Sequence, residues 1–156
     1  MNFDIPNAAI TVEEWIARAA NPSNEGDPFT RVVHVQNGIA YATNRRRMHW
    51  GETVFPDGVY DPASFMPTQF DEDAPDFVKF LPDWADFTDT RISDIEDASP
   101  GPKGESEVRI ADGENVNKTW LLEAMNGKPF RLMIGPHRVA GVGQFGHFMI
   151  AHIKPR

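Results

Sequence analysis

The stretch RVVHVQNGIAYAT, residues 31–43, indicates most clearly which fold the chain adopts. Two runs rich in β-branched and aromatic residues, 31–35 and 39–43, flank a short segment that ends in Asn37-Gly38. Asn-Gly supplies the positive φ angles of a tight turn, so the pattern predicts an antiparallel hairpin. We therefore expect a protein built on antiparallel strands.

A short helix is predicted before this hairpin. Residues 11–20 read TVEEWIARAA and open with the capping pair Thr11 and Glu14. Apolar residues at positions 12, 15, 16 and 19 fall on one helical face. We expect an amphipathic helix that ends before Asn21-Pro22.

The second half of the chain repeats this arrangement. We predict a strand at 107–110, a helix capped by Asn117 and closed at Asn126-Gly127, and three strands at 130–134, 137–142 and 147–153. Each half then contains a short helix and antiparallel strands. The predicted fold class is α+β, with two short helices packed on antiparallel sheet.

Between the halves lies a different kind of sequence. Residues 58–104 are rich in proline, and ten acidic residues fall between Asp71 and Asp97. We predict one domain, 1–156, with an irregular acidic insertion at about 58–104. Carboxylates could hold a divalent cation, but the spacing of a calcium loop is absent, which favours a solvated loop.

Composition excludes several classes of protein. The 156 residues are 40% hydrophobic, carry a net charge of −8 and contain no cysteine. A disulfide framework, a zinc finger and a thiol nucleophile are thereby excluded. The negative charge argues against general coating of DNA. Without a signal peptide or a long apolar run, we expect a cytoplasmic protein.

Three stretches resemble a known family. Residues 42–49, ATNRRRMH, are similar to the Ala-Thr-Asp-Gly-His-Arg-Leu motif of the bacterial DNA polymerase III beta sliding clamp. Residues 117–125, 130–134 and 150–156 resemble the last helix and strands of that clamp. Residues 74–82, APDFVKFLP, are similar to its Phe-Pro-Asp-Tyr-Arg-Arg-Val-Leu-Pro, although here they lie between the two halves. The resemblance implies a DNA-clamp-like fold.

The resemblance also implies a role. Family clamps are processivity factors, rings of six such domains whose helices face DNA and which bind peptides of replication proteins. A single domain would need a homohexamer to close a ring, and a monomer or dimer without encirclement remains the alternative. The small size suits a phage or another mobile element.

A peptide pocket is implied at the matched positions. Its residues would be Thr43, Arg45, Arg46, Arg47, Met48, Ile153 and Pro155, joined by Pro75, Lys79 and Phe80 from the third stretch. A methionine beside arginine donors suits a peptide with an apolar side chain. Arg45-Arg46 replaces the family's Gly-His, and because arginine adopts positive φ only at a cost, we expect an altered turn here. A solvated basic turn is the competing interpretation.

Candidate DNA contacts are the basic residues Arg18, Arg45, Arg46, Arg47, Lys118, Lys128 and Arg131. Glutamates on the same two helices oppose this role. A clamp-fold interaction module that does not encircle DNA, such as a decoy of the host clamp or a structural subunit, is therefore the alternative function.

Catalysis has little support in the sequence. No nucleophile stands beside a plausible base, and His147 and His152 fall on opposite faces of their strand. The glycines of residues 141–146 match Gly-x-Gly-x-x-Gly, but a strand follows them, which favours a turn over a dinucleotide site. We predict a binding protein with no cofactor and no metal, and a His/carboxylate enzyme is the weaker alternative.

Overall fold

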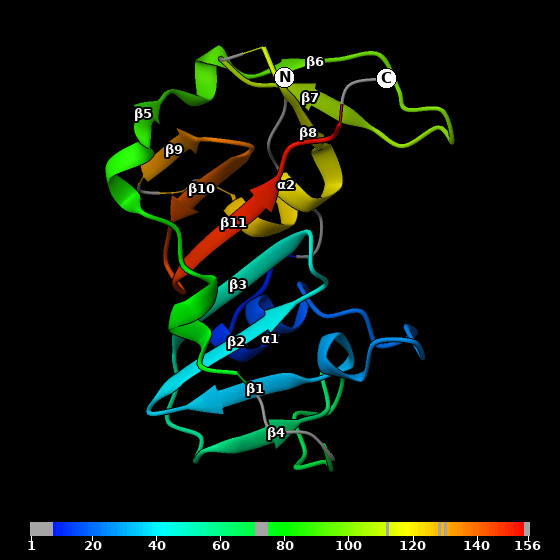
Figure 1. Cartoon of the computed structure of the whole chain (residues 1–156), viewed down its shortest axis with the longest axis vertical. Helices are drawn as coiled ribbons and strands as arrows, with labels where there is room; N and C mark the ends of the chain where they lie inside the picture. Colours follow the sequence, from blue (N-terminus) through cyan, green and yellow to red (C-terminus); the bar gives the residue numbers. More distant parts are fainter. Residues whose placement is uncertain (1–7, 71–74, 112, 128, 130, 155–156) are drawn as a thin grey trace. The chain divides into compact units, whose positions relative to one another are not determined.

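A computed structural model describes residues 8–70, 75–111, 113–127, 129 and 131–154. Its contacts form two compact units. Unit 2 comprises residues 9–82 and 145–147, and unit 1 comprises the rest of the described chain. Both units combine short helices with antiparallel strands, which confirms the α+β class (Figure 1).

Unit 2 contains a four-stranded antiparallel sheet and one α-helix. Its elements are α1 (Val12–Ala17), β1 (Val33–Gln36), β2 (Ile39–Thr43), β3 (Arg47–Glu52), β4 (Gly58–Tyr60) and the short 3-10 helices η1 (Pro28–Arg31) and η2 (Phe77–Phe80). The strand order is β4-β1-β2-β3. The helix α1 packs on β2 and β3 through the buried residues Trp15 and Ile16.

The predicted hairpin is confirmed. His34 pairs with Tyr41 across β1 and β2, and the turn residues Asn37 and Gly38 have φ angles of 51° and 80°. Strand β1 begins two residues later than predicted, because Pro28 starts η1, which extends to Arg31.

The helix α1 begins as predicted and ends earlier. The Thr11 hydroxyl accepts a hydrogen bond from the Glu14 amide at 3.1 Å. Near the other end, His49 Nδ1 donates to the Trp15 carbonyl at 2.7 Å, and the Arg47 guanidinium donates to the Arg18 carbonyl. Side chains of β3 thus satisfy carbonyls that a longer helix would have used, which explains why α1 ends at Ala17.

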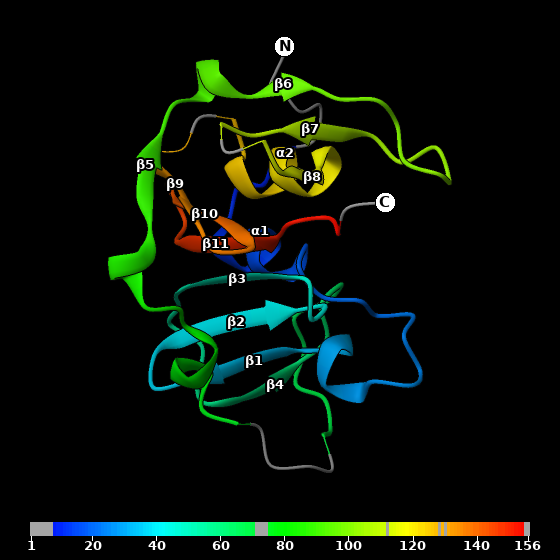
Figure 2. The same cartoon turned by 45° about the horizontal axis from the view of Figure 1, so that its top comes forward.

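Unit 1 contains two groups of antiparallel strands. Its elements are η3 (Trp84–Asp86), β5 (Thr88–Thr90), η4 (Ile92–Asp94), β6 (Glu96–Asp97), β7 (Glu107–Arg109), β8 (Asn115–Asn117), α2 (Lys118–Met125), β9 (Arg131–Gly135), β10 (Arg138–Val142) and β11 (His147–Ala151). The strand orders are β11-β10-β9-β5 and β6-β7-β8. The helix α2 packs beside β7 and β8 (Figure 2).

The caps predicted for α2 are present. The Asn117 side chain accepts a hydrogen bond from the Trp120 amide at 3.0 Å, and Asn126 ends the helix with a left-handed φ of 48°. The spacing of Trp120, Leu121, Ala124 and Met125 predicts one apolar face, and Leu121, Ala124 and Met125 are buried whereas Trp120 is half-buried. No helix in the described part of the chain is both long enough and apolar enough to span a membrane.

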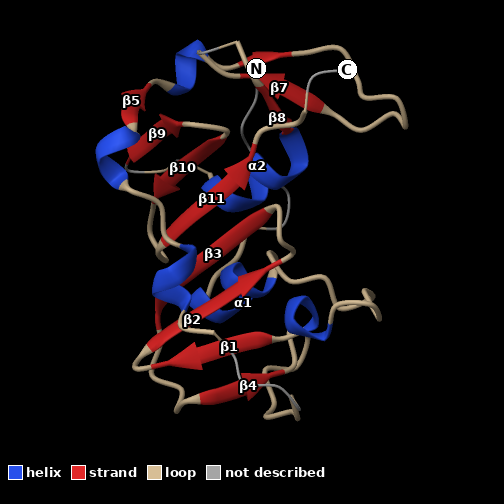
Figure 3. Cartoon of the chain, viewed as in Figure 1, coloured by secondary structure: helices blue, strands red, loops and turns tan. Residues whose placement is uncertain are grey.

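The acidic stretch 58–104 consists largely of loops and single helical turns (Figure 3). Three of its segments, β4, β5 and β6, form outer strands of their respective groups of strands. Asp76 and Asp83 accept hydrogen bonds from the amides of Val78 and Ala85, at 3.1 and 3.0 Å. These carboxylates therefore start 3-10 turns. The single-domain assignment of 1–156, with this stretch as an insertion, remains a prediction.

The first glycine of the 141–146 motif has a packing role. Gly141 lies in β10, where an added Cβ atom would come within 2.5 Å of the ring of buried Phe148. After the motif, β11 begins directly, so the glycines belong to a strand connection, as the sequence predicts.

Substitution of Gly141 by alanine should therefore lower stability. We expect Gly141→Ala to reduce the free energy of unfolding by about 1–3 kcal/mol, because Phe148 has no free space into which to move. Gly143→Ala is the matched control, since its Cβ would meet no atom closer than 3.8 Å. Urea unfolding of both variants tests this, and equal losses would contradict the packing argument.

The burial of His49 should make stability depend on pH. Desolvation lowers the pKa of His49 from 6.5 to about 3. Between pH 6.5 and 3 the unfolded chain therefore binds a proton at His49 that the folded chain does not bind. The free energy of unfolding is highest above pH 6.5 and decreases as the pH falls towards 3, by roughly 1.4 kcal/mol per pH unit. Urea unfolding between pH 7 and 4.5 should show this slope in the wild type and a flatter one in His49→Gln. The surface variant His137→Asn should keep the wild-type slope.

Candidate peptide-binding site

The turn between β2 and β3 keeps a left-handed residue without glycine. Arg45 has a φ of 76°. Its amide donates to the Thr43 hydroxyl at 3.0 Å, and the Asn44 carboxamide oxygen accepts from the amides of Arg46 and Arg47 at 2.9 and 2.8 Å. Neighbouring side chains thus hold Arg45 in a conformation that glycine would adopt freely, and our expectation of a turn altered from that of the family stays a prediction.

The Arg45 side chain turns towards η1. Its Nε and Nη2 atoms donate to the two carboxylate oxygens of Asp27 at 2.8 and 3.2 Å. Its Cζ atom lies 4.9 Å from the centroid of the Phe29 ring. The hydrogen bond from Arg45 lowers the pKa of the Asp27 carboxyl group. A fork-shaped ion pair and a cation–π contact therefore fix this guanidinium above an aromatic ring.

Residues 75–80 lie along the β1–β2 hairpin. The Tyr41 hydroxyl donates to the Pro75 carbonyl at 3.1 Å. The Gln36 side chain donates to the same carbonyl at 3.3 Å and accepts from the Phe77 amide at 3.4 Å. Burial, followed by the charge of Asp76, raises the pKa of Tyr41 to about 12, so this hydroxyl remains a donor at neutral pH.

Six rings form an aromatic cluster against this hairpin. The cluster consists of Phe29, His34, Tyr41, Phe70, Phe77 and Phe80. The centroid of the Phe29 ring lies 5.8 Å from that of Phe80, and the Arg45 guanidinium lies over the Phe29 ring. Two predicted site residues from different stretches, Arg45 and Phe80, therefore contact the same buried ring.

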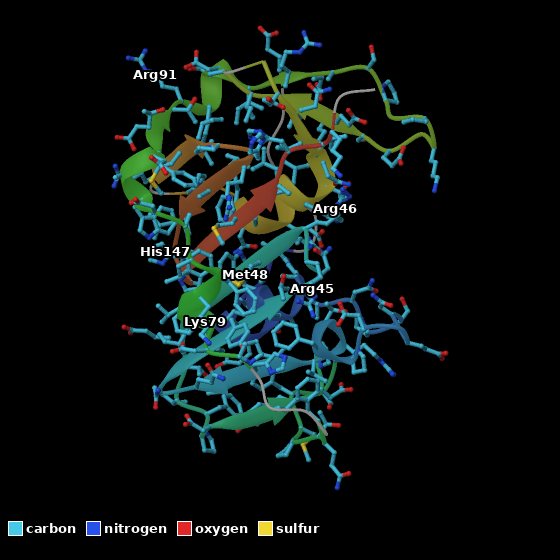
Figure 4. The ribbon with its side chains drawn as sticks, in the orientation of Figure 1. Arg45, Arg46, Met48, Lys79, Arg91 and His147 are labelled. Carbon is cyan, nitrogen blue, oxygen red and sulfur yellow. The ribbon has the colours of Figure 1, made fainter. Side chains whose placement is uncertain are left out.

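The other predicted peptide contacts differ in exposure. Thr43, Arg47 and Met48 are buried, Phe80 and Ile153 are half-buried, and Arg45, Arg46, Pro75 and Lys79 are exposed. Figure 4 shows Arg45 and Arg46 at the β2–β3 turn and Lys79 on η2. Ile153 belongs to unit 1, where it borders a pocket of about 240 Å³. Pro155 and the DNA candidate Lys128 lie outside the described residues.

Several predicted DNA contacts already have carboxylate partners. Arg45 pairs with Asp27, Lys118 Nζ lies 2.7 Å from Asp97, and Arg131 Nε lies 2.6 Å from Asp89. These pairs are partly exposed, so they add little stability. Each carboxylate nevertheless offsets the positive field that would attract a phosphate.

Three residues of the site were not among the predicted contacts: Phe29, Gln36 and Tyr41. The hairpin pattern could have indicated Tyr41, since it pairs with His34 on one face of the sheet. Nothing local in the sequence places Phe29 beneath Arg45, because that contact depends on η1.

The chain resembles known proteins in its three-dimensional structure but not detectably in its sequence. No protein-family model matches the chain, and no curated protein matches it. The chain is similar to the crystal structure of the beta chain of DNA polymerase III from Streptococcus pneumoniae TIGR4, with a TM-score of 0.60 and 10% identity over 97% of this chain and 67% of that one. The fold is DNA-clamp-like.

A second clamp-like structure agrees. DNA polymerase III subunit beta from Borrelia burgdorferi, solved in complex with a natural product, gives a TM-score of 0.58 at 10% identity, covering 100% of this chain and 66% of that one. The chain thus spans about two thirds of the length of these structures. At this identity, the likeness concerns the fold.

Two single substitutions at Arg45, to alanine and to glycine, should separate the contribution of backbone strain to stability from that of the side-chain contacts. Arg45→Ala and Arg45→Gly both lose the ion pair and the cation–π contact, but only alanine is left strained at positive φ. We expect the glycine variant to be more stable by about 1 kcal/mol in urea unfolding. Equal stability of the two variants would show that the turn does not hold a left-handed residue.

Proposed function

We propose that this chain is a non-catalytic, clamp-fold accessory of DNA replication that binds a peptide segment of a partner protein. The observation that carries the proposal is the meeting of Arg45 and Phe80 at the Phe29 ring. The two family-like stretches of unit 2 thus contact the same buried ring, and their exposed parts are the proposed binding surface. The resemblance also implies Ile153 and Pro155, but Ile153 belongs to unit 1 and Pro155 lies outside the described residues, so the surface proposed here is that of unit 2.

The chemistry of this surface suits a short peptide. The half-buried ring of Phe80 offers an apolar contact, and the exposed side chains of Arg46 and Lys79 offer hydrogen-bond donors. Buried Thr43 and Met48 pair with each other where β2 and β3 enter the turn, and the Thr43 hydroxyl accepts from the Arg45 amide. A peptide with an apolar or aromatic anchor and nearby carbonyl or carboxylate acceptors is the expected ligand.

A binding experiment tests this site. A fluorescein-labelled peptide that carries the clamp-binding segment of a bacterial replicative polymerase should bind the wild-type chain, as measured by fluorescence anisotropy. Arg46→Ala and Lys79→Ala should each weaken binding about three- to ten-fold, because each removes one charged donor. Arg91→Ala is the matched control, since Arg91 is exposed but lies in unit 1 (Figure 4). Absence of binding, or equal weakening by Arg91→Ala, would contradict the proposed site.

A second candidate function is a clamp-fold module that does not encircle DNA, acting as a host-clamp decoy or a structural subunit. The ion pairs of Arg45, Lys118 and Arg131 with aspartates favour it, since they offset the charge of three of the seven candidate DNA contacts. The net charge of −8 adds to this argument. Peptide binding is common to both candidates, and DNA separates them.

DNA binding and assembly state distinguish the two candidates. A ring-forming clamp should be a homohexamer in light scattering and should remain on closed circular DNA but slide from linear DNA. A non-encircling module should bind the peptide as a smaller species and show no retention on either DNA at 150 mM salt, near physiological ionic strength. The proposed cytoplasmic location and the proposed phage source belong to both candidates.

A further inference from the structure

Unit 2 carries a second apolar surface, which we name the Met66 surface after its central residue. It consists of Val54, Phe55, Phe65 and Met66, in the loops on either side of β4. The Val54 and Met66 side chains are 96% and 63% exposed. Beneath them, the rings of Phe55 and Phe65 lie 4.7 Å apart, and Tyr60 stacks on Phe65 at 5.1 Å. Apolar side chains thus face solvent on a packed aromatic base, as binding surfaces commonly do.

The loop that presents Met66 is held in shape by its own hydrogen bonds. Asp61 Oδ1 accepts from the amides of Ala63 and Ser64, both at 2.9 Å, and the Asp61 amide donates to the Met66 carbonyl at 2.9 Å. Phe65 lies within this loop at a left-handed φ of 54°. A bulky residue adopts a left-handed φ only at a cost in free energy, so the hydrogen bonds of the loop must hold it there. A loop that is already ordered loses little conformational entropy when a partner binds.

The sequence that carries this surface is mostly acidic. Between Arg47 and Lys79 the sequence contains no lysine or arginine and seven acidic residues: Glu52, Asp57, Asp61, Asp71, Glu72, Asp73 and Asp76. Of these, Glu52, Asp57 and Asp61 are exposed in the segments next to the Met66 surface. Asp57 is also fixed, because it accepts a hydrogen bond from the Asn37 amide at 2.8 Å. An apolar centre with an acidic rim attracts a basic partner.

Asp61 of the same loop also borders a hollow of about 360 Å³, together with Val32, Phe70 and Arg31. Arg31 is the basic residue of this lining, and its Nε atom donates to the Pro22 carbonyl at 3.1 Å. The acidic side chains that a basic partner would meet are therefore Glu52 and Asp57 as well as Asp61.

We propose that the Met66 surface docks a basic amphipathic segment of a partner protein, in which lysine or arginine side chains flank apolar ones. The apolar residues would cover Met66 and Val54, and the basic residues would face Glu52, Asp57 and Asp61. A second copy of this chain fits less well, because a symmetric contact would place one acidic rim against another. This surface is separate from the peptide site proposed above, whose residues are Arg45, Arg46, Lys79 and Phe80.

A model peptide of leucine and lysine, fluorescein-labelled and patterned as an amphipathic helix, tests this proposal on the full chain. Wild type should bind it, and affinity should fall with added salt because charge pairing contributes. The double variant Val54→Ser/Met66→Ser should bind at least about five-fold more weakly, since it removes the apolar contact. Val78→Ser is the matched control: Val78 is 56% exposed in the same unit but lies outside the surface, and its binding should remain within two-fold of wild type.

The possible outcomes separate the alternatives. Equal binding by the double variant and wild type, or equal weakening by Val78→Ser, overturns the proposal. A wild-type dimer in sedimentation that the double variant abolishes also overturns it, in favour of self-association. Arg46→Ala and Lys79→Ala should leave this binding unchanged, so failure here and failure of the proposed peptide site are distinguishable. Urea unfolding confirms that each serine variant is folded.

Discussion

Strand β2 is buried on both faces, and the organisation of unit 2 depends on that constraint. Ala40, Tyr41, Ala42 and Thr43 are all shielded from solvent. Because successive side chains in a strand point to opposite faces, one layer cannot cover them all. The helix α1 covers one part of the strand, and the aromatic cluster, with residues 75–80, covers Tyr41. The candidate site is therefore a consequence of how β2 is covered.

Local features of this fold could be predicted, and long-range ones could not. The Asn37-Gly38 turn, the Thr11 and Asn117 caps and the end of α2 at Asn126 each depend on neighbours a few residues away, and all are present. For the segment around Arg45–Met48 the sequence left a peptide pocket and a solvated basic turn open, and it did not predict strand β3, which contains Arg47 and His49. Both are buried, since their donors satisfy carbonyl groups of the α1 segment.

The candidate site shows the same division. The sequence motif indicated positions 43–48, yet it gave no means of finding Phe29, which links Arg45 to Phe80 through ring contacts. The loss of the family's glycine pointed to an altered turn. The positive φ is nevertheless kept, because Thr43 and Asn44 supply side-chain acceptors to the turn amides. Such compensation depends on the geometry of three consecutive residues, which a residue-by-residue comparison does not capture.

The replacement of glycine by Arg45 also changes what the turn can do. A glycine would provide only backbone conformation, whereas Arg45 places a cation over an aromatic ring and pairs it with Asp27. The paired guanidinium is a weaker attractor of phosphate, but its remaining donors can still meet a carbonyl group, whereas the Phe29 ring beneath it is buried. The same distinction applies to Lys118 and Arg131, whose aspartate partners lower the local positive charge. These three ion pairs offset part of the positive charge that encirclement of DNA requires, which is a physical argument for the non-encircling candidate proposed above.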